Sequence, residues 1–374
     1  MFYGGGIWEY LRSKGGMTNH SRQFDDLPPG GGRGNRFGII QLSDLQFGEN
    51  HTFGNPSDIA ERLLKDVKKM SREHQFTPVY MVLSGDITET GDPEEFQDAA
   101  NVIEGLVNEL KIPNMNILCI PGNHDVSRRL TQESESGNEQ LKFQPYHRFV
   151  SEVTNKSYAF EKDTYPRITN DRPRADAQLK IAGPLDFQFE FLLLNSCEKI
   201  DRSNKEGYIC PRKLSSTLRV GEDEDKLRIA ILHHPLHNSF NDDIKPITNA
   251  SQVGRILASH KYNIVLTGHV HQGYVNVVSF GGQHTIIFAS CGSTGINHEK
   301  RIDGVQNQYC IHVIDFDRNK LQSIWRAYNP SSNYGLGSWV SDNAFEERNP
   351  TIFDLFCINR TAPSRFPRGQ NETT

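Results

Sequence analysis

The sequence has no long apolar run, few cysteines and no strong excess of one charge. No window reaches the roughly 18 consecutive apolar residues that a membrane helix requires, so we expect no contact with a membrane. The six cysteines lack the paired spacing of zinc and redox motifs. With 41 Lys and Arg against 46 Asp and Glu, the net charge is −5. This charge disfavours a protein that coats long nucleic acids.

The N-terminal residues lack a basic segment followed by an apolar one, so we expect no secretory signal and predict a cytoplasmic location. Residues 1–35 are rich in glycine, and we predict a flexible Gly-rich leader there. No Gly-Lys-Ser or Gly-Lys-Thr follows the glycines at 30–34, which argues against a phosphate-binding P-loop.

From Arg36 on, short apolar runs alternate with helical patterns, which is typical of α/β folds. At about 150 residues per domain, the length allows one large domain or two modest ones. We predict one domain at 36–330 with a polar insertion near the site at 126–184, followed by a C-terminal extension and polar tail at 331–374. The predicted strands are 37–42, 79–83, 115–120, 189–194, 227–232, 263–266, 285–289, 311–316 and 321–327.

Two segments, 57–74 and 93–111, have the apolar periodicity of amphipathic helices. The second begins with Asp92 as N-cap, Pro93 in the first turn and Glu95 at the capping-box position. We expect one further helix in the insertion. Its apolar positions are Tyr146, Phe149, Val150 and Val153.

Five of the predicted strands end, within a few residues, in side chains that bind hard or borderline metal ions. These segments are Ser43-Asp44-Leu45-Gln46, Ser84-Gly85-Asp86, Gly122-Asn123-His124-Asp125, His233-His234-Pro235 and Thr267-Gly268-His269-Val270-His271. Because the carboxyl ends of neighbouring strands share one crevice in an open α/β sheet, we expect the five segments to converge. The mixture of imidazole and carboxylate suits Mn, Fe or Zn, and Asp86 can supply an oxygen that two cations share.

In these five segments the chain resembles the calcineurin-like metallophosphoesterases. The local sequence around these segments includes Ser-Gly-Asp-Ile-Thr-Glu-Thr-Gly and Leu-His-His-Pro. It is most similar to the branch of the family that contains cyclic-nucleotide and glycerophosphodiester phosphodiesterases. The resemblance covers roughly residues 36–327. It implies an α/β fold, a four-layer α/β/β/α sandwich of two mixed sheets flanked by helices, in which we expect the 311–327 hairpin to close the second sheet.

The resemblance also implies two metal ions, Mn, Fe or Zn, that are bridged by Asp86 and a water-derived hydroxide. The other implied ligands are Asp44, His271 and the residue at position 46 for one ion, and Asn123, His233 and His269 for the other. His124 is expected to assist the leaving group and not to bind metal. His234 and His237 lie off the family pattern.

The sequence departs from the family at Gln46, where the family usually has histidine. A glutamine carbonyl is a weaker and harder ligand than imidazole, so the first ion should bind less tightly or be a harder ion. His51, a few residues on, is an alternative ligand.

Three functions remain open from the sequence. The first is a phosphodiesterase acting on a small, cyclic nucleotide-like diester through attack by a metal-bridging hydroxide. The second is a nuclease or phosphomonoesterase on the same metal site, although a chain of this net charge does not favour nucleic acid as a partner. The third is a non-catalytic binding module that keeps the fold, for which Gln46 is the best argument.

Overall fold

The computed structural model describes residues 36–49, 51–53, 56–134, 141–155, 163–169, 179–180, 188–201, 204–218, 226–237, 246–280, 284–332 and 337–355. The predicted leader, the end of the polar tail and Cys357 lie outside the described residues. Within the described part of the chain, no helix combines the length and the apolar composition needed to cross a membrane.

The first sheet is mixed and has the strand order β13-β12-β11-β1-β2-β3, with β14 also paired to β12. Strands β1, β2 and β3 run parallel to one another, whereas β11 is antiparallel to β1. The bounds are β1 (Arg36–Leu42), β2 (Thr77–Leu83), β3 (Ile117–Cys119), β11 (Gln308–Asp315), β12 (Lys320–Asn329), β13 (Ser338–Ser341) and β14 (Thr351–Asp354).

The second sheet is also mixed and has the order β5-β4-β6-β7-β8-β10-β9. Its central strands β6, β7, β8 and β10 are parallel, and β9 is antiparallel to β10 at the edge. The bounds are β4 (Arg167–Thr169), β5 (Leu179–Lys180), β6 (Gln188–Leu194), β7 (Lys226–Leu232), β8 (Ile264–Thr267), β9 (Tyr274–Phe280) and β10 (His284–Ser290).

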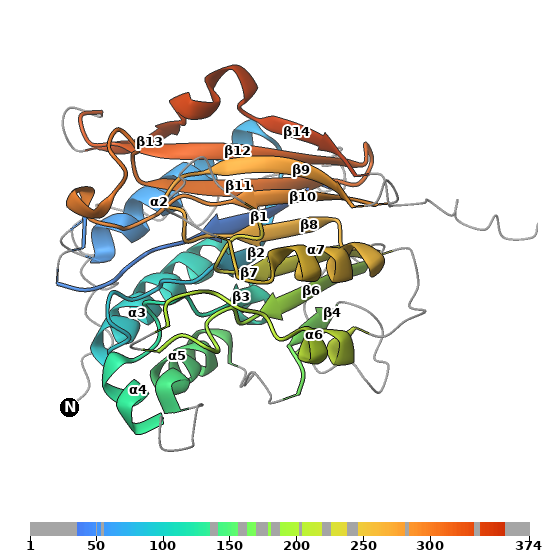
Figure 1. Ribbon diagram of the computed structural model, residues 1–374. Helices are drawn as coiled ribbons and strands as arrows, with labels where there is room; N and C mark the ends of the chain where they lie inside the picture. Colours follow the sequence, from blue (N-terminus) through green and yellow to red (C-terminus); the bar gives the residue numbers. More distant parts are fainter. Residues whose placement is uncertain are drawn as a thin grey trace, which may run out of the picture.

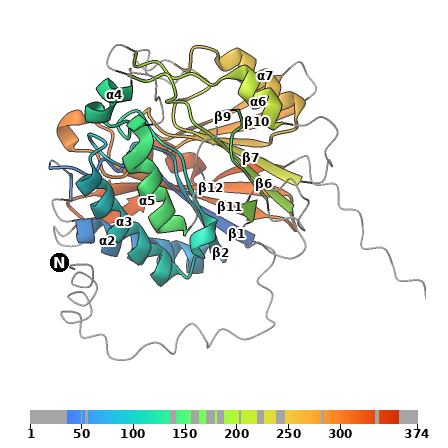
Figure 2. The same ribbon diagram turned by 90° about the horizontal axis from the view of Figure 1, so that it is seen from below.

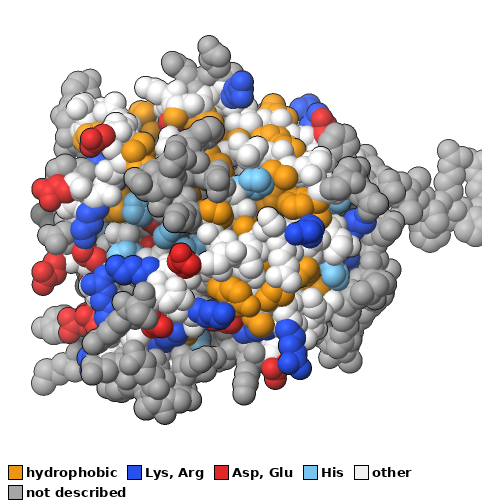
Figure 3. All heavy atoms as spheres, in the orientation of Figure 1, with side chains coloured by type: hydrophobic (Ala, Val, Ile, Leu, Met, Phe, Trp, Pro, Cys, Tyr) orange, Lys and Arg blue, Asp and Glu red, His pale blue; other side chains and the backbone are white. Residues whose placement is uncertain are grey.

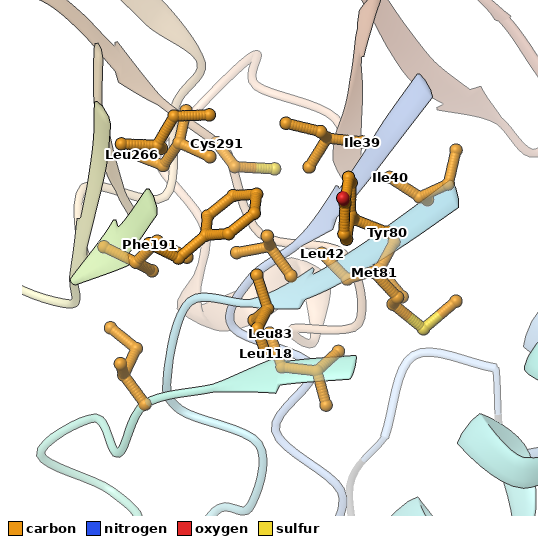
Figure 4. Close-up of a cluster of buried hydrophobic side chains, with 14 of the residues drawn as sticks. Ile39, Ile40, Leu42, Tyr80, Met81, Leu83, Leu118, Phe191, Leu266 and Cys291 are labelled. Atoms are coloured by element: carbon orange, nitrogen blue, oxygen red, sulfur yellow. The ribbon is translucent and has the colours of Figure 1, made fainter. Parts of the chain in front are cut away.

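The two sheets pack face to face through large apolar side chains (Figure 4). The ring of Tyr80 in β2 lies 5.5 Å from that of Phe189 and 5.0 Å from that of Phe191, both in β6. Leu266 of β8 belongs to the same buried cluster as Ile39 of β1. Burial of these side chains between the sheets is the main force that holds the layers together.

Helices cover the outer faces of the sheets and complete the predicted four layers (Figures 1 and 2). Viewed from below, α2, α3 and α5 lie on one side of the strands, and α6 and α7 lie on the other. The bounds are α2 (Pro56–Glu73), α3 (Pro93–Leu110), α4 (Arg128–Ser134), α5 (Gln144–Thr154), α6 (Pro211–Thr217) and α7 (Ala250–Ser259). The predicted fold, an α/β/β/α sandwich of two mixed sheets, is therefore confirmed.

The two helices expected from periodicity form as α2 and α3, and all nine predicted strands are present. At the start of α3, the Glu95 carboxylate accepts hydrogen bonds from the backbone amides of Thr90 and Asp92, as a capping box requires. Helix α5 buries the four apolar side chains expected of the insertion helix.

The predicted hairpin forms as β11 and β12, but its place in the sandwich differs from the expectation. It extends the first sheet beside β1 instead of closing the second sheet, because β11 pairs with β1 along its length. Residues after 330 extend the same sheet, since β13 and β14 both pair with β12.

Candidate metal centre

The loops that follow β1, β2, β3, β7 and β8 meet at one edge of the sandwich, as the sequence predicts. Oδ1 of Asp44 in the first loop lies 3.2 Å from Nε2 of His271 in the last loop. The backbones of Asp44, Gln46, Asp86, His269 and His271 all have left-handed φ angles between 45° and 69°. Such angles strain non-glycine residues, by about 1–3 kcal/mol each, and are typical of functional sites.

The Asp44 carboxylate uses its two oxygens differently. Its Oδ2 accepts hydrogen bonds from the Ser43 hydroxyl at 2.6 Å and from the backbone amide of His269 at 3.1 Å. Its Oδ1 is buried, has no hydrogen-bond partner among the described residues and lies 3.2 Å from Nε2 of His271. Oδ2 therefore fixes the position of the carboxylate, and Oδ1 remains available to bind a metal ion.

The Asp86 carboxylate repeats this division. Its Oδ1 accepts a hydrogen bond from the backbone amide of His124 at 2.8 Å. Its Oδ2 is buried without a hydrogen-bond partner in the described part of the chain and lies 3.3 Å from Nε2 of His233. Burial alone would raise the pKa of Asp86, but the facing imidazoles of His233 and His124 lower it below its ordinary value.

Gly85 has a functional reason to be glycine. Its φ is +91°, and a Cβ on it would lie 2.5 Å from Nδ1 of His233. A side chain at this position would push the imidazole away from Asp86.

The orientation of the His233 imidazole is fixed by a hydrogen bond to the backbone. Its Nδ1 donates to the carbonyl oxygen of Ser84 at 2.9 Å, which leaves Nε2 facing Asn123 Oδ1 at 3.2 Å and His269 Nδ1 at 3.2 Å. Burial would lower the pKa of His233, but the Asp86 carboxylate raises it to about 9. The electrostatic field at this point therefore favours a positive charge.

Two groups of side chains can each hold a metal ion, and both contain Asp86. The first is Asp86, His233 and His269, and the second is Asp44, Asp86 and His271, with the ligand atoms of each group within 4.8 Å of one another. The buried, unpartnered oxygens of Asp44 and Asp86 and the converging acceptors at His233 fit a pair of cations.

The three remaining predicted site residues lie close to these groups. Asn123 contacts His233 through its side-chain oxygen, and Gln46 is buried with its backbone amide donating to the carbonyl oxygen of Asp86 at 3.0 Å. His124 belongs to neither group. Its Nδ1 donates to the carbonyl oxygen of Glu89 at 2.7 Å, which leaves Nε2 available.

His51 is buried in the loop after β1, next to Phe47 and Gly295. Its ring stacks on Phe47 with centroids 4.8 Å apart, and a Cβ on Gly295 would lie 2.5 Å from its Nε2. It belongs to neither candidate group. This position disfavours the alternative in which His51 replaces Gln46 as a ligand.

Asp125 has a role that the sequence prediction missed. It is fully buried, and its carboxylate accepts hydrogen bonds from the backbone amides of Ile87, Thr88 and Gly122. It therefore ties the loop after β2 to the loop after β3, and so fixes Asp86 relative to Asn123. Its position within the Gly122-Asn123-His124-Asp125 segment was the available signal.

The space-filling view shows histidine side chains gathered on the left of the visible face, beside Lys and Arg side chains (Figure 3). Asp and Glu side chains lie among them, so this part of the visible face carries charges of both signs.

The chain is similar to known proteins in sequence and in structure. The family model for calcineurin-like phosphoesterase matches residues 37–273. The uncharacterized metallophosphoesterase-like protein YydB of Bacillus subtilis (strain 168) is 25% identical over 262 residues, which is 64% of this chain and 50% of the relative. The chain thus spans about half the length of that relative.

Two solved structures are similar at low sequence identity. A dimetal phosphatase from Danio rerio is 14% identical, with 78% of this chain and 96% of that chain covered and a TM-score of 0.47. The purple acid phosphatase PPD1 from yellow lupin (Lupinus luteus) is 10% identical, with 82% and 54% covered and a TM-score of 0.45. The family model covers more than half of the sequence, and on this ground the chain belongs to the calcineurin-like phosphoesterase family.

Proposed function

We propose that this protein hydrolyses a small phosphodiester, similar in size to a cyclic nucleotide, with two metal ions. The proposed ligands are Asp44, Gln46, Asp86, Asn123, His233, His269 and His271. The observation that carries the proposal is that Asp86 is shared by both candidate metal groups. A carboxylate between two cations is the expected bridge in a two-metal phosphoesterase.

The donor set suits Mn, Fe or Zn, because each group combines carboxylate oxygen with imidazole nitrogen. When bound, two neighbouring ions polarise phosphoryl oxygens and lower the pKa of water. The buried Asp44, Asp86 and His233 and the half-buried His269 and His271 would hold the ions in place.

His124 is the proposed general acid. Its Nδ1 is committed to the carbonyl oxygen of Glu89, so the ring is fixed and Nε2 is the nitrogen that can give a proton to the leaving oxygen. Its backbone amide binds Asp86, which keeps the ring next to the metal centre.

Side-chain nucleophiles are disfavoured. Ser293 is fully buried in the glycine-rich loop after β10, and burial raises the pKa of the Cys291 and Cys197 thiols. Water is therefore the proposed attacking group.

A diester substrate is supported by the resemblance of the sequence segments to the phosphodiesterase branch. The test is hydrolysis of bis(p-nitrophenyl) phosphate and of p-nitrophenyl phosphate by protein loaded with Mn²⁺. We expect faster turnover of the diester, and Asp86→Ala is the inactive control. Preference for the monoester would refute the diester assignment, and no turnover of either ester by protein that holds two ions would refute catalysis.

A further inference from the structure

A single buried amide, that of Gln41 in β1, links the two sheets directly behind the metal centre. Its Nε2 donates to the backbone oxygen of Thr267 in β8 at 2.9 Å and to the hydroxyl of Ser84 at 3.1 Å. Gln41 belongs to the first sheet and Thr267 to the second, so this hydrogen bond crosses the interface. None of the Gln41 side chain reaches the surface.

The residues that Gln41 binds stand at the base of the ligand loops. Ser84 comes two residues before Asp86, and Thr267 comes two residues before His269. Gln41 itself lies near the end of β1, the strand that leads into the loop of Asp44. One amide therefore connects the loops that carry the oxygen ligands with a loop that carries imidazole ligands.

The link is not needed to complete the strand pairing. The backbone oxygen of Thr267 already accepts a hydrogen bond from the amide of Cys291 at 2.9 Å. The bond from Gln41 is an additional one. It adds a directional contact between the strands, beside the hydrogen bonds that join the loops, such as those from His233 to Ser84 and from His269 to Asp44.

The orientation of the Gln41 amide is fixed by two further buried side chains. His312 in β11 places its Nε2 2.9 Å from Oε1 of Gln41 and its Nδ1 2.9 Å from the hydroxyl of Ser323 in β12. Because Oε1 can only accept, Nε2 of His312 donates, and Nδ1 accepts from Ser323. Burial lowers the pKa of His312 to about 3, in keeping with this neutral tautomer.

We propose that Gln41, oriented by His312 and Ser323, is a positioning residue that sets the distance between the two halves of the metal centre. The inference rests on the proposed two-metal function, because each candidate ion needs a carboxylate from the first sheet and imidazole from the second. Gln41 is not one of the proposed ligands. It acts through Ser84 and Thr267.

The test is Gln41→Met, which keeps an unbranched side chain of similar length. It removes the two hydrogen bonds that Nε2 donates and the one that Oε1 accepts from His312. The measurements are Mn²⁺ affinity by calorimetry, the electron paramagnetic resonance signal of coupled Mn²⁺ ions, and the thermal midpoint. We expect about 10- to 100-fold weaker Mn²⁺ binding, which is the usual effect of losing a group that orients ligands, together with a loss of spin coupling.

The matched control is Ile39→Ala. Ile39 lies on the same strand and, by strand alternation, on the same side as Gln41, and it is buried in the core without belonging to the polar network. This variant should lower the thermal midpoint and keep the Mn²⁺ affinity and coupling. If Ile39→Ala weakens Mn²⁺ binding as much as Gln41→Met does, the positioning role is wrong and general destabilisation explains the effect.

Ser323→Ala is the second variant, in case Gln41→Met does not fold. It removes the hydroxyl that orients His312 and should weaken Mn²⁺ binding in the same direction by a smaller factor. Suppose that the natural protein binds two ions and that the variant that folds, Gln41→Met or Ser323→Ala, has an unchanged Mn²⁺ affinity. This result overturns the inference and leaves the proposed function intact. Failure of the natural protein itself to bind Mn²⁺ overturns the proposed function and this inference together.

Discussion

The two sheets contribute different kinds of proposed ligand to one centre. The loops of the first sheet supply oxygen donors, from Asp44, Asp86 and Asn123, whereas the loops of the second sheet supply the imidazoles. Those imidazoles belong to His233, His269 and His271. Neither sheet alone completes either candidate group, so the centre depends on how the sheets dock.

The carboxylates of the first sheet and the imidazoles of the second sheet are also held by different hydrogen bonds. The carboxylates of Asp44 and Asp86 are fixed by backbone amides that leave one oxygen of each without a hydrogen-bond partner among the described residues. The imidazole of His233, in contrast, is fixed by donating to a carbonyl oxygen of the opposite sheet, that of Ser84. Each half of the centre is therefore oriented partly by the other half, and variants of the two halves should have distinct effects.

The largest effect is expected from Asp86→Ala in the first sheet. Because Asp86 belongs to both groups, its loss should remove both ions and abolish activity. Metal content per chain, measured by mass spectrometry after dialysis, should fall from two equivalents to none.

A suitable control for this variant is Asp315→Ala. Asp315 is a buried carboxylate of β11 that pairs with Arg36 at the opposite end of β1 from the centre. The Asp315→Ala variant should keep both ions. Two equivalents in Asp86→Ala would show that Asp86 is not the bridge.

The next effect is expected from His271→Ala in the second sheet. His271 belongs to only one of the groups, so one equivalent of metal should remain, held by Asp86, His233 and His269. Metal analysis under the same conditions provides the measurement. Loss of both ions would mean that the two groups do not bind independently, and retention of both would remove His271 from the ligand set.

A third variant concerns His124, the imidazole that comes from the first sheet and lies outside both groups. His124→Ala should keep both ions and slow turnover by roughly 10² to 10⁴, the usual contribution of a positioned general acid. The loss should shrink for esters with good leaving groups such as nitrophenolate. An equal loss on good and poor leaving groups would contradict the assigned role.

The smallest effect is expected from Gln46→His, which places an imidazole in the first sheet. One better ligand should tighten Mn²⁺ binding at the group of Asp44 and His271 by about tenfold, or about 1.4 kcal/mol. The concentration of Mn²⁺ that gives half-maximal activity is the readout. The control, His51→Ala, should leave this concentration unchanged, since the His51 ring stacks on Phe47. If His51→Ala raises the concentration and Gln46→His does not change it, His51 is the ligand.

Much of the fold was predictable from the sequence because its central strands are buried on both faces. Strand β7 is buried at every position, and its apolar run at 229–232 is easily recognised. Five strands have no predicted counterpart, namely β4, β5, β9, β13 and β14. Strand β9 is a half-exposed edge strand, and the other four have only two to four residues, so their pairing depends on tertiary contacts.

The predicted ligand residues were recognisable by their side chains and their positions after strands, but their geometry was not. Asp44 and Asp86 have left-handed backbone angles that non-glycine residues rarely adopt, and the sequence contains no signal for them. The same holds for the amide of Gln41, which the strand pattern represents only as a polar residue in an apolar run. These features arise from contacts between segments far apart in the chain.

The central claim is that two ions share Asp86 and that each is bound by groups from both sheets. The most direct measurement is an anomalous difference map from crystals grown with Mn²⁺. The account predicts two peaks that both contact Asp86, one beside Asp44 and His271 and the other beside His233 and His269. A single peak, or two peaks that do not share Asp86, would contradict it.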